Sequence, residues 1–238
     1  MNFNVKELSS FLNKISFGNT IMQGVLNFEE SGISVKIFDG QVVYTKGFLP
    51  NNVVQGYEAI GMIGIKDFNF LIKSVHRFNM SVDIIIDKST LTLKAGGKKI
   101  VIALMEEKFI NQPQDIKLEY ENKFSILTSQ LKSVAEDTRL FSDPILRFET
   151  KEGVMSATIK KGTIQESISN DMYNKEIKEG DYVEIRPSFY QGLIKCLSAE
   201  NVDVEIKKDH PLIMNETFEN GSWYKYLIAP IVKEEKKK

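Results

Sequence analysis

The sequence predicts an α+β protein made of two tandem copies of one domain, each with two helices packed on antiparallel sheet. Three observations lead to this prediction. Similar segments recur about 120 residues apart, each half contains two amphipathic helical patterns, and short alternating runs typical of strands fill the rest. A repeat of this length exceeds the roughly 20 to 50 residues of a solenoid unit. We therefore expect two similar domains rather than a repeat array.

The internal repeat keeps its spacing along the chain. Its paired segments are 24–28 with 144–148, 32–35 with 153–156, 70–75 with 192–197, and 82–86 with 202–206. Between the copies, residues 106–114 lack any periodicity. We therefore expect an N-terminal domain over residues 1–105, a connecting loop over 106–115, a C-terminal domain over 116–232 and a charged tail over 233–238.

The composition is that of an ordinary globular protein. With 238 residues, of which 42% are hydrophobic, the chain can form two modest cores. A single cysteine, Cys196, excludes an internal disulfide, and no apolar run approaches the roughly 18 residues of a membrane span. The N-terminus shows no basic segment followed by an apolar stretch. The sequence thus predicts a protein inside the cell, cytoplasmic or associated with the nucleoid, that is not secreted and has no membrane partner.

Four segments carry helical periodicity: residues 5–17, 66–78, 124–139 and 187–198. Pro187 suits the first turn of the last one. The residues expected on the buried faces are Val5, Leu8, Leu12 and Ile15, then Phe68, Leu71, Ile72 and Val75, then Leu127, Leu131 and Val134, and finally Phe189, Leu193 and Leu197.

Strand patterns occupy equivalent places in the two halves, and sixteen or more strands are expected. The clearest runs are 25–28, 33–37, 41–48, 82–86, 91–93 and 99–104 in the first half, and 145–148, 154–159, 163–169, 202–206, 212–214 and 223–228 in the second. Gly96-Gly97 is typical of a two-residue hairpin turn.

The helical segments are basic although the chain is not. The whole chain has a net charge of −1, whereas the four segments contain eight basic and four acidic residues, a net of +4, which leaves −5 elsewhere. Any amphipathic helix carries charge on its wet face, so an ordinary solvated surface remains one interpretation. Basic helices at repeated positions also suit sequence-independent contact with a phosphate backbone. The candidate residues for that surface are Lys6, Lys14, Lys66, Lys73, Arg77, Lys132, Arg139 and Lys195.

Three passages in the second half, residues 140–148, 209–212 and 223–231, resemble those of sliding clamps of the proliferating-cell nuclear antigen type, which include the clamps of T4-like phages. Residues 209–212, Asp-His-Pro-Leu, and 223–231, Trp-Tyr-Lys-Tyr-Leu-Ile-Ala-Pro-Ile, are similar to the family's Pro-Leu strand and its terminal Tyr-Leu-Ala-Pro signature, with Ile228 inserted. Residues 140–148 resemble the archaeal members after the third helix. Similarity of pattern covers nearly the whole chain.

This resemblance implies a closed ring of three subunits, in which helices line a hole and curved sheets form the outer wall. Ring closure requires a head-to-tail contact between an edge strand of the first domain and one of the second. By family position, the interface residues are Lys99, Ile100, Val101 and Ile102, together with Thr163, Ile164, Glu166 and Ile168.

The resemblance also implies an apolar pocket that binds short peptides of partner proteins. Carried over by position, its residues are Phe38, Val42, Phe109, Ile110, Pro211, Leu227, Ala229 and Ile231. Leu227 stands where the family usually has an aromatic residue. For each residue alone, packing in the core is the competing interpretation.

Nothing in the sequence indicates an enzyme. No phosphate-binding loop of the Walker type is present, and His76 and His210 have no second ligand at metal spacing. Cys196 is expected to be a small core residue, and Glu29, Glu30, Glu106 and Glu107 to be solvated. No catalytic residue, metal or cofactor is expected.

The first functional hypothesis is a DNA polymerase processivity factor, a sliding clamp that acts in DNA replication and repair. Its expected partners are double-stranded DNA, a DNA polymerase, an ATP-dependent clamp loader, other replication or repair proteins with short peptide motifs, and two further copies of itself in a homotrimer. The alternatives are a virion or scaffold ring protein that reuses the fold, and a subunit of a heterotrimeric checkpoint-type clamp.

Overall fold

A computed structural model of the chain describes residues 1–114, 118–161, 167–174 and 177–231. It divides into two compact units, unit 1 with residues 1–115 and 217–225, and unit 2 with residues 116–216 and 226–238. The expected C-terminal domain, 116–232, thus differs from unit 2 because residues 217–225 group with unit 1. Within the described ranges, no helix is long and apolar enough to cross a membrane.

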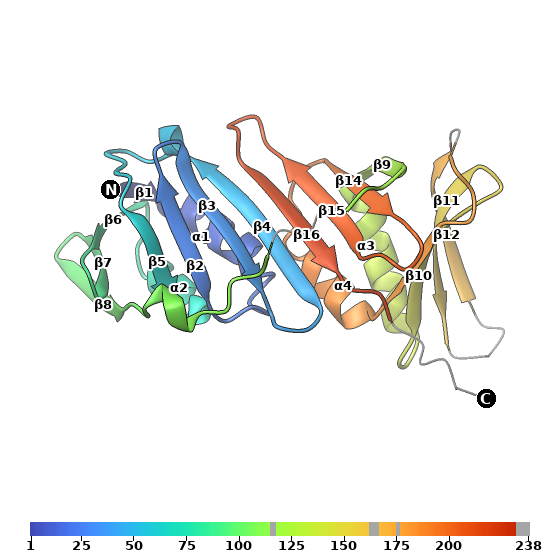
Figure 1. Cartoon of the computed structure of the whole chain (residues 1–238), viewed down its shortest axis with the longest axis horizontal. Coiled ribbons are helices and arrows are strands. Elements are labelled where there is room, and N and C mark those ends of the chain that lie inside the picture. Colours follow the sequence, from blue (N-terminus) through green and yellow to red (C-terminus); the bar gives the residue numbers. More distant parts are fainter. Residues whose placement is uncertain (115–117, 162–166, 175–176, 232–238) are drawn as a thin grey trace. The chain divides into compact units, whose positions relative to one another are not determined.

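Figure 1 labels the helices and strands of both units. Up to residue 109 these are β1 (Asn2–Asn4), α1 (Val5–Ile15), β2 (Gly24–Glu29), β3 (Gly32–Phe38), β4 (Val43–Pro50), the 3-10 turn η1 (Asn51–Val53), β5 (Gly61–Ile65), α2 (Phe68–Val75), β6 (Ser81–Ile86), β7 (Thr90–Ala95), β8 (Lys98–Ala103) and η2 (Glu107–Phe109). The remaining elements are β9 (Asn122–Leu127), α3 (Thr128–Asp137), η3 (Thr138–Leu140), β10 (Ile145–Lys151), β11 (Val154–Lys160), β12 (Ser167–Asn174), β13 (Tyr182–Ile185), α4 (Pro187–Ile194), β14 (Asn201–Ile206), β15 (Leu212–Thr217) and β16 (Trp223–Ile228).

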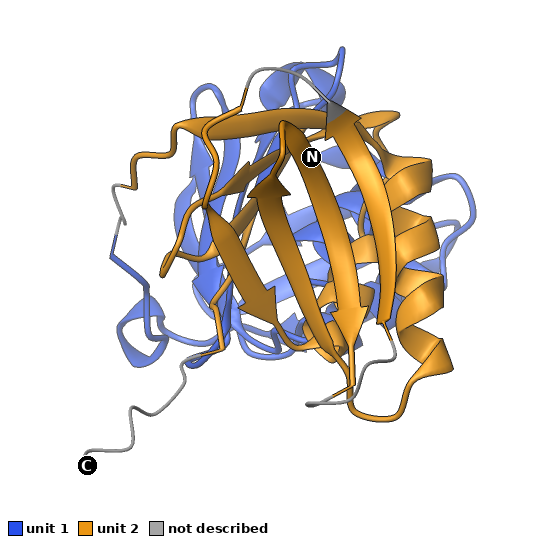
Figure 2. Ribbon diagram, turned by 90° about the vertical axis from the view of Figure 1, so that its right-hand side faces the viewer, with its two compact units in different colours: residues 1–115, 217–225 blue, residues 116–216, 226–238 orange. Residues whose placement is uncertain are grey.

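The sheet topology repeats and confirms the predicted duplication. Unit 1 contains the strand orders β1-β6-β7-β8 and β5-β2-β3-β4. Adding eight to each number gives the orders β9-β14-β15-β16 and β13-β10-β11-β12 of the second copy. Figure 2 shows unit 2 in orange, with its strands side by side and a helix running along them. Each copy is therefore an α+β domain with two helices packed against antiparallel strands.

In unit 1, short polar residues start the helices and apolar faces hold them in place. The Asn4 side chain accepts hydrogen bonds from the N–H groups of Lys6 and Glu7, and Asp67 accepts one from Phe70. The predicted inner face of α1 is fully buried, with Leu12 and Ile15 at 1% and 0% exposure. In the same way, the predicted inner face of α2 is at most 4% exposed. Because these faces are buried, the opposite faces of α1 and α2 point toward solvent.

Three details of unit 2 differ from the sequence-based expectation. Leu127 was expected on a helical face, but it ends β9 and is 44% exposed, because α3 begins only at Thr128. In α4, Tyr190 rather than Phe189 is fully buried, since its hydroxyl reaches the carbonyl of Leu131 at 2.8 Å. The helix itself ends at Ile194, before Leu197, which is nevertheless buried.

The strand predictions hold best where a long alternating run exists. Gly96 and Gly97 form the predicted hairpin turn, both with positive φ, between the paired residues Ala95 and Lys98. The sequences of the short strands β1, β5, β9 and β13 show no clear strand pattern. Residues 163–166 of the predicted 163–169 strand lie outside the described residues, and the strand continues to Asn174.

We predict that the protein loses stability above pH 10. Burial raises the pKa of the hydroxyls of Tyr120 and Tyr190, and burial with the charge of Glu29 raises the pKa of Tyr57 to about 12. The folded state then keeps protons that the unfolded state releases near pH 10. The free energy of unfolding should stay level up to about pH 10 and fall above it. Urea titrations between pH 8 and 11.5 measure this, and a level profile to the upper limit would contradict it.

Candidate functional site

On α1 the structure separates two lysines that the sequence placed on one exposed face. Lys6 is exposed, whereas Lys14 is only 3% exposed, so the expectation of an outward Lys14 is wrong. The reason is the 217–225 segment of unit 1, which covers this end of the helix. The Lys14 ammonium lies 5.0 Å from the ring centroids of both Phe218 and Tyr224. No sequence pattern indicates this contact, because the two rings lie about 200 residues further along the chain.

The α2 segment presents the clearest basic surface of unit 1. Lys66, Lys73 and Arg77 are all exposed, as expected, although Lys66 precedes the helix and Arg77 follows it. Phe70 shares this exposed side at 49% exposure. A further cation that sequence reasoning missed is Lys98, whose ammonium donates a 2.9 Å hydrogen bond to the carbonyl of Arg77. The end of α2 therefore combines charges from the helix and from the β7–β8 turn.

In unit 2, the candidate basic residues Lys132, Arg139 and Lys195 are exposed. Glu136 is also exposed on α3, so this surface carries mixed charge. Sequence reasoning missed Arg186, an exposed residue at the N-cap of α4. Arg139 and Arg186 both line a cavity of about 510 Å³. Two of these basic residues therefore lie together where α3 ends and α4 begins.

Within unit 1, the predicted peptide-pocket residues lie in two short turns. Phe38 ends β3 and Val42 precedes β4, and both are half-buried. The Asp39 carboxylate between them accepts hydrogen bonds of 2.8–2.9 Å from the backbone N–H groups of residues 41, 42 and 43, and these bonds hold the turn in place. In the connecting loop, Phe109 is 67% exposed while Ile110 is 6% exposed. Ile110 therefore anchors the loop, and Phe109 offers an apolar surface.

Within unit 2, the four remaining pocket candidates lie on β16, after it, and before β15. Leu227 is 4% exposed and contributes mainly to the core, whereas Pro211, Ala229 and Ile231 are partly exposed. The Ile231 N–H donates to the carbonyl of Glu184 at 2.7 Å, which holds the segment after β16 against β13. A joint peptide site formed by all eight residues stays a prediction.

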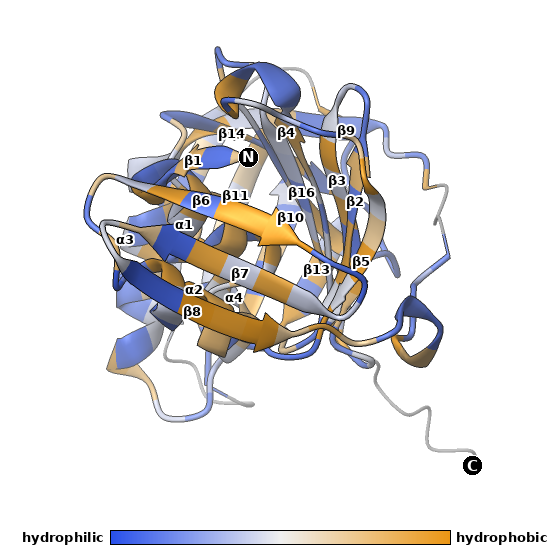
Figure 3. Ribbon diagram, turned by 90° about the vertical axis from the view of Figure 1, so that its left-hand side faces the viewer, coloured by the Kyte–Doolittle hydropathy of each residue, from blue (hydrophilic) through white to orange (hydrophobic). Residues whose placement is uncertain are grey.

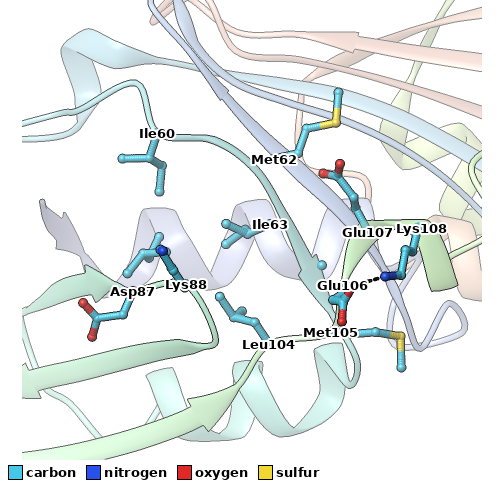
Figure 4. Close-up of a pocket in the computed structure, with 12 residues that line it drawn as sticks. Ile60, Met62, Ile63, Asp87, Lys88, Leu104, Met105, Glu106, Glu107 and Lys108 are labelled. Atoms are coloured by element: carbon cyan, nitrogen blue, oxygen red, sulfur yellow. Dashed lines mark ion pairs between the residues drawn. The ribbon is translucent and has the colours of Figure 1, made fainter.

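The start of the connecting loop is fixed to β5. The Met105 N–H donates to the Gly64 carbonyl at 2.9 Å, and the turn η2 follows directly. Figure 4 shows the adjoining cavity, of about 720 Å³, with Ile63 and Leu104 beside it and an ion pair between Glu106 and Lys108 at its edge. The path of the loop therefore depends on close approach to Gly64.

We predict that Gly64→Ala displaces this loop. An added Cβ would lie 2.2 Å from the Met105 oxygen and 2.8 Å from Cδ1 of Ile110. Such overpacking costs about 1–3 kcal/mol of unfolding free energy. Urea unfolding measures that cost, and faster tryptic cleavage after Lys108 reports the displaced loop. The control Met62→Ala changes a side chain of the same strand that is 50% exposed, and should alter neither value. Equal stability and cleavage of the Gly64 variant and the wild type would refute the prediction.

The predicted interface strands lie at sheet edges. Among the residues that the structure describes, β8 pairs only with β7, and Figure 3 shows it as the last strand of its sheet, hydrophilic at its start and hydrophobic beyond. β12 is likewise the last strand of its sheet and pairs with β11. On β8, Val101 is 52% exposed and Ile100 half-buried, while Ile102 is 8% exposed. Ile168 of β12 is half-buried, and Thr163, Ile164 and Glu166 lie outside the described residues.

The other chemically active residues occupy ordinary positions. Cys196 is buried, as predicted, with its thiol 3.5 Å from the Gly192 carbonyl. His76 is exposed after α2, and His210 is half-buried with its Nδ1 2.8 Å from the Lys208 carbonyl. Among the residues that the structure describes, no group of three or more His, Cys, Asp or Glu side chains could hold a metal ion.

Comparisons by sequence find no match, since neither a protein-family model nor a curated protein matches this chain. Comparison by structure finds several solved structures that match. The A. fulgidus PCNA bound to the C-terminal region of FEN-1 is 18% identical, with a TM-score of 0.84 over 98% of each chain. The Thermococcus kodakaraensis PCNA is 15% identical, with a TM-score of 0.79 over 97% of this chain and 99% of that one.

A third solved structure agrees with these two. The proliferating cellular nuclear antigen of Entamoeba histolytica is 13% identical, with a TM-score of 0.79 over 97% of this chain and 98% of that one. The match thus extends across both copies of the duplicated domain although little sequence identity remains. This chain has the two-domain fold of the PCNA sliding clamps.

Proposed function

We propose that this protein is a DNA sliding clamp, a non-enzymatic homotrimeric ring that encircles duplex DNA and tethers a DNA polymerase. The observation that carries the proposal is the placement of charge. Basic residues are exposed on or beside all four helices, in a chain whose net charge is −1. Contacts of lysine and arginine with phosphate carry no sequence information, which suits a protein that must move along DNA.

The edge strands support ring closure. An unpaired strand edge presents N–H and C=O groups that another chain can pair with. Pairing β8 of one subunit with β12 of the next is a head-to-tail contact, which forms a closed ring when the rotation per subunit closes. Three subunits with two similar domains each would give a ring with six similar domains.

The exposed apolar residues support binding of partner peptides. Phe109 and the half-buried Phe38 and Val42 are available to an apolar motif, and the A. fulgidus relative was solved with the C-terminal region of FEN-1 bound. By this analogy, the polymerase and other replication or repair proteins would bind through short peptide motifs. Because a closed ring cannot thread onto circular DNA, a separate ATP-dependent loader would open it inside the cell.

The oligomeric mass in solution tests the ring directly. A homotrimer has three times the 27.1 kDa mass of the chain, or about 81 kDa, by light scattering after size exclusion. A concentration-independent mass of one chain would refute the homotrimeric ring, and assembly only with other subunits would favour the heterotrimeric alternative.

A further inference from the structure

One edge of strand β5 in unit 1 lies open beside the cavity of Figure 4. Among the described residues, β5 pairs along its length only with β2. We propose that the open edge binds an extended segment of a partner protein, which adds a strand to β5 and places apolar and basic side chains at the cavity. None of the residues that line this cavity belongs to the predicted peptide pocket, so this is a separate site.

The first argument is an unused pair of backbone groups at Met62. The Gly64 carbonyl accepts a 2.9 Å hydrogen bond from Met105, on the side of β5 away from β2. In a strand, the N–H and C=O groups of every second residue point to the same edge, so those of Met62 point there too. The hydrogen bonds found among the described residues include none to either group. A single residue of an added strand would bond to both.

The second argument is that the chain itself begins such a strand and then leaves it. Gly64 and Met105 form an isolated antiparallel bridge, and the turn η2 then carries the chain away from β5. The open edge of β5 therefore already accepts one antiparallel partner residue. An added strand would continue this ladder beside Met62, in the space that the connecting loop leaves open.

The cavity fits apolar side chains on its inner side. It measures about 720 Å³, within the roughly 300–1,000 Å³ of typical binding pockets. Ile63 is 7% exposed, and Ile86 and Leu104 are half-buried. Residues paired across strands point to the same face, so the residue opposite Met62 points outward with Met62, and its two neighbours point inward with Ile63. These two neighbours should therefore be apolar.

The charge of the lining favours a basic residue opposite Met62. The lining contains three acidic and two basic residues, which gives it a net charge of −1. Glu106 forms an ion pair with Lys108, whereas Glu107 has no ion pair with any described residue. Figure 4 shows Glu107 on the same side of the cavity as Met62. The segment that fits best thus has the pattern apolar, basic, apolar.

The test uses a short synthetic peptide of alternating valine and lysine, capped at both ends and labelled with a fluorophore. Anisotropy should show saturable binding to the full chain. Bound peptide should slow amide hydrogen exchange at Met62 at least fivefold, because its N–H becomes bonded, and leave Ile63 nearly unchanged, because that N–H already points to β2. A control peptide with methylated backbone nitrogens at its lysines cannot complete the ladder and should bind at least tenfold more weakly.

Two variants of the protein should each weaken binding of the valine–lysine peptide at least fivefold. Met62→Pro removes only the outward N–H, which an edge strand tolerates. Glu107→Lys reverses the charge that faces the lysine of the peptide. The control Phe109→Ala should bind as the wild type does, because Phe109 belongs to the predicted peptide pocket and does not line this cavity.

The outcomes separate this site from the proposed clamp function. Absence of saturable binding, unchanged exchange at Met62, or equal binding of the methylated peptide would overturn the proposal. Weaker binding by Phe109→Ala alone would assign the peptide to the predicted pocket, which overturns the β5 site and leaves the clamp function standing. Because neither the strand edge nor the cavity depends on ring formation, a monomeric mass in solution would leave the β5 site in place.

Discussion

Replacing Val101 with proline will convert the proposed ring to monomers while each chain stays folded. The Leu104 N–H donates to the carbonyl of Ser89, and bonded pairs alternate along an antiparallel ladder. With the register Leu91–Ile102 and Thr92–Val101, the Val101 N–H therefore points away from β7. Proline removes only this outward donor, which edge strands tolerate. The bulky ring also blocks a neighbouring strand.

The expected loss is large because, in the proposed ring, β8 is one of the two strands at each subunit contact. Removing a ladder hydrogen bond and introducing a clash costs on the order of 3 kcal/mol, or about 100-fold in subunit affinity. Light scattering should show a shift from about 81 kDa to the 27.1 kDa chain. Val101→Ala keeps the N–H group and should remain trimeric. A trimeric proline variant, or one whose circular dichroism shows unfolding, would contradict the assignment of β8.

The double variant Lys73→Glu, Arg77→Glu will bind duplex DNA far more weakly than the wild type. Both side chains are exposed, Lys73 on α2 and Arg77 shortly after its end. If each contacts a phosphate, the slope of log affinity against log salt should decrease by about 1.8, since each contact contributes roughly 0.9. Reversing the charges adds repulsion, so affinity should fall at least 10-fold at low salt. Fluorescence anisotropy with a short labelled duplex measures both quantities.

A matched double variant controls for net charge. Lys88→Glu, Lys108→Glu makes the same change of charge at two exposed residues that line the cavity of Figure 4. It should keep nearly all of the DNA affinity. Equal losses in the two double variants would mean that only overall charge matters. No loss in the α2 variant would favour a scaffold ring that holds no DNA.

The parts of the fold that the sequence predicted depend on neighbours in the chain. The exposed position of Lys73 on α2 follows from helical spacing, and the Gly96-Gly97 turn from two adjacent glycines with positive φ. The duplicated topology follows from a repeat spacing that stays near 120 residues. In these cases, local periodicity already determines which side of an element is buried.

The parts that the sequence missed depend on distant contacts. Lys14 has the spacing of an exposed residue, yet Phe218 and Tyr224 cover it. Leu127 fits a helical face, but strand pairing with Asn201 keeps it in β9. The cavity beside β5 has no signature in the sequence at all, because three separate segments of the chain line it. Predicting such sites requires knowing which segments pack together.

The most direct test of the clamp function is retention on circular DNA. Dissociated subunits are allowed to reassociate with a nicked circular plasmid, and the complex is isolated by gel filtration at moderate salt. A restriction enzyme then cuts the plasmid once, while an uncut sample serves as the control. Topological retention predicts that the protein stays on the circle and leaves the linear molecule through its ends. Protein that remains equally bound to the linear plasmid would contradict an encircling clamp.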